Sequence, residues 1–211
     1  MNLSSRLRLL ALTVSAPLWI AGGMSTAVAG ENMATHVQIR GVVETLAGEQ
    51  LTVTSHEGSR VNVNLSTTVG VSAVKKASID DIKKGDYVGI ASLPASHGQE
   101  GALEVLIFPA QLKGVGEGRF NYDLKPGSSM TNATVANAVK SVDHGEVTVT
   151  WHGHTKKIEI ADDTPIVTLA PATKKDIQSG IPVFIPAEKD ANGVLSTQML
   201  IVGKNGVVPP M

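Results

Sequence analysis

The sequence predicts an all-β fold of two tandem small OB-like (oligonucleotide/oligosaccharide-binding) β-barrel domains, each with one short helix. Three observations lead to this prediction: an internal duplication, short Val- and Thr-rich segments bounded by turn residues, and an aromatic content of only 3%. A closed barrel leaves no free strand edges and can fill its interior with Val, Ile and Leu. It therefore needs few aromatic side chains.

The duplication is visible when the chain is aligned with itself. Leu51–Thr54 is followed 96 residues later by Val147–Thr150, and Asp81-Ile82 is followed 95 residues later by Asp176-Ile177. Further matches at this second offset are Gly85 with Gly180, Val88 with Val183 and Ile90 with Ile185. The same order of matched segments predicts two copies of one small domain.

Each copy reads as five strands and one short helix. In the first copy the predicted strands are Gly41–Leu46, Gln50–Thr54, Arg60–Leu65, Asp86–Ala91 and Ala102–Phe108. Val61, Val63 and Leu65 alternate with polar residues, which is the period of a strand with one buried face. Ser78–Gly85 predicts a helix of one or two turns, because a capping Ser comes first, acids follow, and Gly ends it.

The domain boundaries follow from this pattern. We expect a cleaved signal peptide at residues 1–29, a first barrel at residues 30–108 and a second barrel at residues 135–211. Between the barrels lies a Gly/Pro-rich connector, residues 109–134, which contains Phe120 and Tyr122. Plain linkers are polar, so these aromatic residues indicate a connector that packs. The alternative is a ligand-binding loop.

The N-terminal segment has the order of a secretory signal. Arg6 and Arg8 precede an uncharged apolar run, Leu9–Ile20, and Ala27-Val28-Ala29 fits the small-x-small pattern of a cleavage site. The run is too short to span a bilayer, which needs about 20 apolar residues. We therefore expect Sec-type export, cleavage after Ala29, a periplasmic location and no transmembrane segment in the mature chain.

Composition excludes several classes of function. The chain has a net charge of −1, and removal of 29 residues leaves 16 basic and 19 acidic side chains. A nucleic-acid partner is not expected, because phosphate neutralisation needs a basic face. The absence of cysteine excludes thiol nucleophiles, disulfides and thiolate metal sites.

Several segments resemble a known family. They are Ile107–Pro109, Gly114–Gly118, Tyr122–Pro126, Ser129–Thr134 and Gly206–Met211. They resemble exported bacterial proteins of unknown function with tandem small β-barrel repeats, which are often labelled automatically as metal ABC transporter permeases. The resemblance implies fold and compartment and supplies no catalytic residue. The permease label conflicts with this sequence, because a permease crosses the membrane several times.

Six histidines are the candidates for a metal site. His144, His152 and His154 lie closest in sequence, and neutral imidazole binds copper, nickel and zinc ions. Against this, the duplication aligns His152 with His56 at a hairpin end, where solvated turn histidines are common. A histidine-based Cu, Ni or Zn carrier is therefore the alternative function.

No credible catalytic constellation is present in the sequence. Ser72–Lys75 matches a Ser-x-x-Lys pattern but lies in a segment predicted to be extended, where that chemistry does not work. We therefore expect no enzyme and no cofactor, and a non-catalytic periplasmic module that binds an unknown protein or small ligand. Its candidate contact residues are Phe120, Tyr122 and Trp151. A cell-envelope glycan hydrolase is the second alternative, and it would need paired carboxylates across a cleft.

Overall fold

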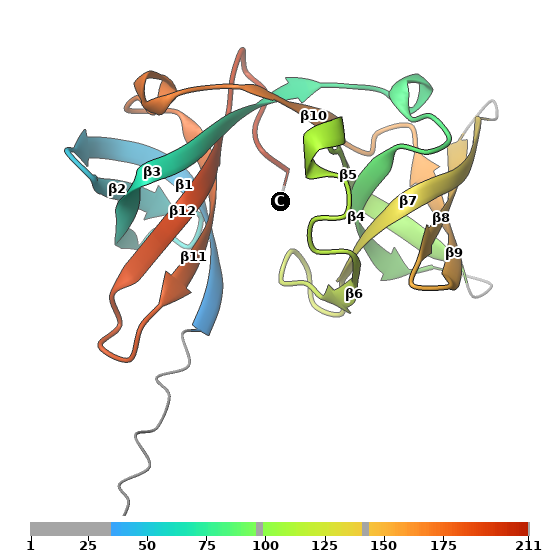
Figure 1. The fold of residues 1–211 in the computed structure, drawn as a ribbon, viewed down its shortest axis with the longest axis horizontal. Coiled ribbons are helices and arrows are strands. Elements are labelled where there is room, and N and C mark those ends of the chain that lie inside the picture. The colour runs from blue at the N-terminus through green and yellow to red at the C-terminus, as the bar shows by residue number, and fades with distance from the viewer. Residues whose placement is uncertain (1–34, 96–98, 141–143, 211) are drawn as a thin grey trace, which may run out of the picture. The chain divides into compact units, whose positions relative to one another are not determined.

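The structure, a computed structural model, describes residues 35–95, 99–140 and 144–210 (Figure 1). Over these residues the chain is all-β, as predicted, with twelve strands in one hydrogen-bonded sheet. The predicted signal peptide lies outside the described residues. Within the described part, no helix has the length and apolar character needed to cross a membrane.

The strands follow the predicted segments closely and in several cases extend them. The first six are β1 (Thr35–Ala47), β2 (Gln50–Ser55), β3 (Arg60–Lys76), β4 (Tyr87–Pro94), β5 (Glu100–Ile107) and β6 (Gly118–Asn121). The others are β7 (Ser129–Lys140), β8 (His144–Trp151), β9 (His154–Ala161), β10 (Ile166–Pro171), β11 (Pro182–Lys189) and β12 (Leu195–Val202).

The predicted helices are single 3-10 turns. η1 (Ile79–Asp81) and η4 (Lys174–Asp176) occupy the same place in the two copies, and η3 (Ala110–Leu112) lies in the connector. The Asp81 carboxylate accepts bonds from the backbone and hydroxyl of Ser78, and Asp176 does the same for Thr173. These capping boxes satisfy the backbone donors that begin each turn.

Five strands close a ring that we call the first ring. β11, β1, β2 and β3 are neighbours through antiparallel pairing. β12 closes the ring, because it pairs antiparallel with β11 and parallel with β3. Its interior is apolar and includes Leu51, Val53, Val63, Ile185 and Leu200, all fully buried.

A second ring is built in the same way from β4, β5, β7, β8 and β9. β5, β4, β7, β8 and β9 pair antiparallel in that order. The parallel pairing of β5 with β9 closes the ring. Its interior includes Val88, Ile90, Val105, Val147 and Ile158.

The rings do not follow the predicted boundaries of residues 30–108 and 135–211. β11 and β12 of the second copy complete the ring of β1 to β3, while β4 and β5 of the first copy complete the ring of β7 to β9. The reason lies in the length of β3, which has 17 residues. Its last segment, Ser72–Lys76, continues past the first ring and pairs with β10. Each copy therefore gives its last two strands to the other ring (Figure 1).

Matching hydrogen bonds hold each exchanged pair of strands in place. The Gly85 N–H donates to the carbonyl of Val135 at 2.8 Å, and the Gly180 N–H donates to the carbonyl of Val43 at 2.9 Å. Both glycines have positive φ, at 91° and 82°, a region that favours glycine. The same local geometry therefore occurs in both copies, immediately before β4 and immediately before β11.

The connector packs on the second ring, as a docked segment would. β6 pairs with β7, and the Arg119 guanidinium makes two bonds to the buried Glu100 carboxylate, at 2.7 and 2.8 Å. Lys156 and Ser92 also contact this carboxylate, at 2.9 and 2.8 Å. Burial raises the pKa of Glu100, but the bonds from Lys156, Ser92 and Arg119 outweigh it, so the pKa lies below its usual value.

Candidate functional site

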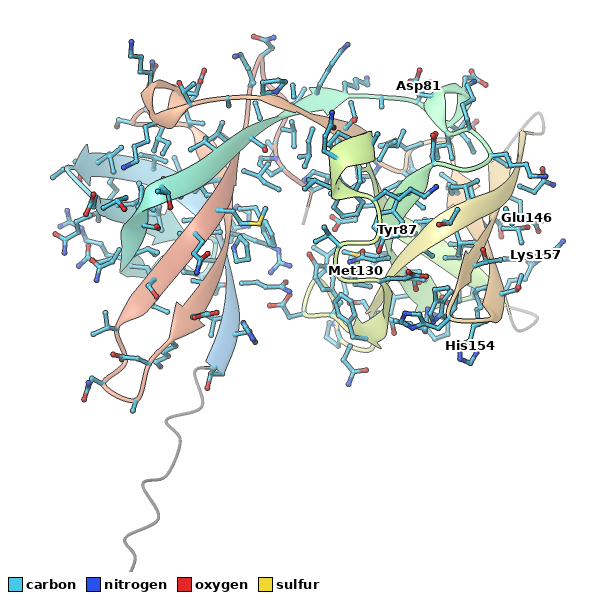
Figure 2. All side chains as sticks on the ribbon, in the orientation of Figure 1. Asp81, Tyr87, Met130, Glu146, His154 and Lys157 are labelled. Carbon is cyan, nitrogen blue, oxygen red and sulfur yellow. The ribbon has the colours of Figure 1, made fainter. Side chains whose placement is uncertain are left out.

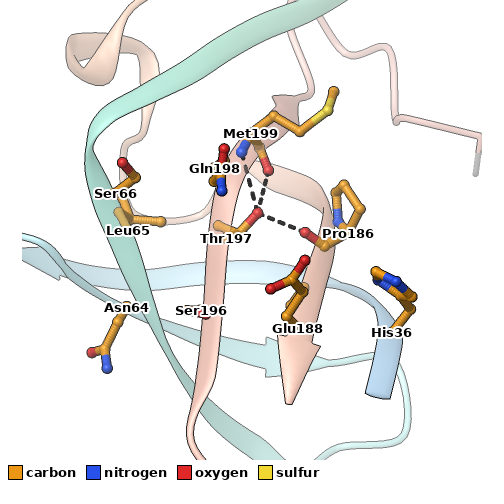
Figure 3. A pocket seen from close by; sticks show the side chains of 11 residues that line it. His36, Asn64, Leu65, Ser66, Pro186, Glu188, Ser196, Thr197, Gln198 and Met199 are labelled. Carbon is orange, nitrogen blue, oxygen red and sulfur yellow. Dashed lines mark hydrogen bonds between the residues drawn. The ribbon is translucent and has the colours of Figure 1, made fainter. Parts of the chain in front are cut away.

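A groove of about 530 Å³ lies on the first ring (Figure 3). Four strands supply its walls: β1, β3, β11 and β12. The lining mixes polar and apolar side chains, among them His36, Asn64, Pro186, Glu188, Ser196 and Met199. Sites that bind small molecules or peptide side chains are concave and have volumes of this order.

The groove forms because β3 and β12 separate. Leu65 pairs with Thr197 and Gly70 pairs with Met199, so four residues of β3 face the single residue Gln198 of β12. The extra residues of β3 form a bulge, within which the Ser66 hydroxyl accepts a bond from the Thr68 N–H at 3.3 Å. The parallel pairing resumes beyond the bulge.

Thr197 holds the far wall of the groove in place. Its hydroxyl lies 2.6 Å from the Pro186 carbonyl oxygen and 2.7 Å from the Met199 carbonyl oxygen, and it accepts a bond from the Met199 N–H (Figure 3). Thr197 is buried, so these contacts fix the β12 backbone at the bulge. The Met199 side chain itself is exposed and projects from this fixed backbone.

A second cluster of polar side chains surrounds Arg40. Its guanidinium donates to the Asp123 carboxylate at 2.8 Å and to the Gln38 side chain at 2.9 Å. It also lies over the rings of Tyr122 and Phe184, 5.3 and 5.5 Å from their centroids. A cation between two aromatic faces is a stabilising arrangement, so Arg40 of the first ring holds the connector.

Glu104 is the most unusual member of this neighbourhood. It lies on β5, is 3% exposed, and its Oε1 atom has no hydrogen-bond partner among the residues that the structure describes. Burial raises the pKa of Glu104 to about 8, and the positive charge of Arg40 offsets part of this increase. The Glu104 carboxyl is therefore protonated at neutral pH, which removes the cost of burying a charge.

The three predicted contact residues differ in exposure. Phe120 is exposed on β6. Tyr122 is buried among Ala91 and Met130, and burial raises its pKa. Trp151 is half-buried at the edge of the second core, and its ring lies beside that of His154, with 5.6 Å between the centroids and 31° between the ring planes. The structure therefore does not bring these residues together in one described groove.

The predicted metal ligands lie at two ends of one hairpin. His152 and Gly153 form the two-residue turn between β8 and β9, with φ of 43° and 80°, and His154 follows it (Figure 2). His144 begins β8, seven residues before Trp151, which is about 23 Å of extended chain. β8 therefore separates the backbone of His144 from the other two. Over the described residues, no group of three His, Asp or Glu side chains is arranged to hold a metal ion.

Arg40, Glu104 and the groove were not predicted from the sequence, although His36 of the groove is one of the six candidate histidines. Glu104 carries a usable signal, because it is a lone charge inside the apolar run Leu103–Ile107. The groove carries none, since it depends on pairing between β3 and β12, which are far apart in sequence. No protein-family model, curated protein or solved structure matches the chain.

Proposed function

We propose that the protein is an exported, non-catalytic module that binds a polypeptide partner through the first ring. The observation that carries this proposal is the groove of about 530 Å³ where β3 and β12 separate. Its walls belong to a closed ring with an apolar core, which supports a groove that is already formed before any partner arrives. Rigid binding surfaces lose less conformational entropy on association.

The chemistry of the groove suits a peptide. Met199 and Pro186 offer apolar surface, while Asn64, Ser196 and Gln198 offer amide and hydroxyl groups. An exposed methionine adapts its shape to different apolar partners, and the polar groups can pair with a peptide backbone. The chain's small net charge gives no basic field that would favour nucleic acid.

The strand order supports an OB-like assignment for each ring. Five strands form a closed antiparallel ring with one parallel contact, and a 3-10 turn precedes β4 in the first copy and β11 in the second. Barrels of the OB class bind ligands on the face formed by their second and third strands. In the first ring these strands are β2 and β3, and β3 forms one wall of the groove.

Export is the part of the proposal that rests on sequence alone. The basic start, the apolar run and the Ala27–Ala29 site support a periplasmic protein that begins at Gly30. Mass spectrometry of the protein recovered from the cell envelope should show Gly30 as the first residue. An intact N-terminus would contradict export by a cleaved signal.

The binding proposal is tested with a library of acetylated octapeptides and the ¹⁵N-labelled mature chain. We expect some peptides to bind and to shift the amide signals of residues that line the groove. Met199→Lys should weaken binding at least tenfold, because it places a charge in the groove. Val115→Lys is the matched control, since Val115 is equally a solvent-exposed apolar residue but lies in the connector. Equal loss in both variants, or no binding, would contradict the proposal.

A further inference from the structure

The two rings present equivalent outer faces, because equivalent strands build them. The pairing of β11 with β12 repeats the pairing of β4 with β5 at an offset of 95 residues, so that Glu188 takes the place of Leu93. The pairing of β11 with β1 repeats that of β4 with β7 in the same way. The first-ring groove therefore has a counterpart on the second ring, and the two places can be compared residue by residue.

On the second ring the connector covers this face. Tyr122 packs on Ala91, and Leu124 packs against the same cluster of side chains. Further along the connector, a Cβ built at Gly127 would lie 3.9 Å from the Leu93 side chain. The connector thus places an aromatic ring at one end of the face and reaches the other end five residues later.

On the first ring the same face is open. Pro186 and Glu188 hold the places of the two covered residues of β4, and they form the β11 wall of the groove (Figure 3). Met199 is 42% exposed, whereas its counterpart on the second ring, Glu104, is 3% exposed. Among the described residues, those that line the groove all belong to β1, β3, β11 and β12. The groove is therefore this outer face without the connector.

The groove continues the surface on which the connector is held. Arg40 of β1 lies over the Tyr122 ring and donates to Asp123 of the connector. The same guanidinium lies over the ring of Phe184 on β11. Pro186 is the next outward residue of β11 after Phe184, because residues two apart in a strand share a face. A segment bound in the groove would therefore lie next to the connector.

Glu188 gives the groove a negative charge that the second ring lacks. The residue is exposed, and the ion pairs formed by the described residues do not include its carboxylate. Its counterpart Leu93 is apolar and lies under the connector. A charge at the rim of a binding surface selects partners of opposite charge. The groove therefore favours a segment that brings a basic side chain to Glu188.

We propose that the groove binds an extended partner segment whose aromatic residue packs on Pro186 and Met199 and whose basic residue pairs with Glu188. This proposal rests on the proposed function and names the chemistry of its partner. The aromatic residue takes the place that Tyr122 has on the second ring, and aromatic rings make favourable contacts with methionine sulfur. The basic residue follows it by five positions, as Gly127 follows Tyr122.

The test uses the ¹⁵N-labelled protein of the library experiment and the peptide acetyl-Asn-Tyr-Ser-Leu-Lys-Pro-Lys-amide. This probe is the segment Asn121–Gly127 with serine in place of Asp123, which removes a like charge, and lysine in place of Gly127. We expect the probe to shift the amide signals of Glu188 and Met199. A peptide with serine in place of tyrosine should bind at least tenfold more weakly.

A charge swap isolates the pairing with Glu188. Glu188→Lys should weaken binding of the probe at least tenfold, and it should strengthen binding of a peptide with glutamate as its last residue. Glu57→Lys is the matched control, because Glu57 is an exposed acid of the same ring that lies in the β2–β3 turn and does not line the groove. It should leave the affinity for both peptides within twofold.

A photocrosslink identifies what occupies the groove. The chain has no cysteine, so Gln198→Cys gives a single site for a benzophenone label on the groove wall. We expect the labelled protein to crosslink to the probe. Crosslinks to residues before Thr35 of the same chain would overturn the proposal, because a segment of this protein would then fill the groove.

The outcomes separate this proposal from the proposed function. If library peptides bind the groove but neither the tyrosine nor the last lysine of the probe affects affinity, the partner chemistry is wrong and the proposed function stands. Equal weakening by Glu188→Lys and Glu57→Lys would also overturn the proposal, since the charge would then act at long range. If neither the probe nor any library peptide shifts the groove signals, both proposals are wrong.

Discussion

Val74 and Leu169 face each other at the centre of the antiparallel contact between β3 and β10, and they occupy the same position in the two copies. They are 95 residues apart, as Asp81 and Asp176 are. When equivalent residues of two repeats pair antiparallel, a local two-fold axis passes between them. This pair therefore marks the point about which the two copies exchange strands.

Truncation of Val74 should destabilise the protein. Val74 is 2% exposed and packs with Leu106, Val167 and Ile201 near the local axis. Val74→Ala should lower the free energy of unfolding by about 1–3 kcal/mol, through lost apolar burial and the cavity left behind. Urea denaturation measures this. A loss below about 0.5 kcal/mol would mean that Val74 is not packed as described.

The Arg119–Glu100 pair should matter far more than a surface pair of similar length. Arg119→Met leaves a buried carboxylate with fewer donors and should cost about 3 kcal/mol in unfolding free energy at pH 7. Lys157→Met is the control. It breaks the exposed pair with Glu146, at 2.9 Å, and should cost less than about 1 kcal/mol. Similar costs for the two variants would contradict the role of Arg119 in docking the connector.

Glu100 should also contribute to acid sensitivity. Its pKa is lowered in the folded state, so its stabilisation is present above the pKa of the unfolded chain and is lost as the pH falls through the folded value. Glu100→Gln should therefore flatten the decline of unfolding free energy below about pH 4.5. Urea denaturation between pH 3 and pH 7 measures this. An unchanged acid limb would show that Glu100 titrates normally.

Glu104 should have the opposite effect in a higher pH range. Its pKa of about 8 lies above that of an unfolded glutamate, so the folded state keeps a proton that the unfolded state loses. Stability should therefore fall as the pH rises from about 5 to about 8, by at most about 1.4 kcal/mol per pH unit. Glu104→Gln should remove this slope in urea denaturation. Parallel curves for the two proteins would contradict the raised pKa.

The β8–β9 turn gives a test of backbone conformation alone. Gly153 has a φ of 80°, and a Cβ added there would meet no described atom within 4 Å. Gly153→Ala should cost about 1 kcal/mol because alanine is strained at positive φ. Gly70→Ala is the control, since an added Cβ there would make only ordinary van der Waals contact, at 3.8 Å or more, and its φ lies outside the left-handed region. Equal thermal midpoints for both variants would contradict the turn geometry.

The sequence predicted the strands well because they depend on local pattern. Gln50–Thr54 and Arg60–Leu65 lie within β2 and β3, and the capped turns begin at Ser78 and at its counterpart Thr173. The exchange could not be predicted in the same way. The residues of β11 would have the same alternating pattern whether they paired with β7 or with β1. The pairing of β3 with β10 carries β11 to β1, and the sequence pattern does not reveal this pairing.

The candidate site was harder to predict than the fold. The groove arises from a mismatch between Ser66–Val69 and Gln198, which no spacing in the sequence reveals. Tyr122 was singled out as an aromatic residue of the connector, but its ring packs inward under Arg40. The aromatic residues of the connector correctly predicted that it packs. They did not indicate that Tyr122 is buried while Phe120 is exposed.

The exchange of strands between the two copies is tested most directly by an engineered disulfide in this cysteine-free chain. His36 faces Glu188 across β1 and β11, in a non-hydrogen-bonded pair whose spacing suits a disulfide. Mild oxidation of the His36→Cys/Glu188→Cys protein should give an intramolecular disulfide, detected by mass spectrometry and thiol counting. In a tandem arrangement β11 would pair with β7, which would place Ser128 against Glu188. A disulfide in Ser128→Cys/Glu188→Cys, with none in the first protein, would contradict the exchange.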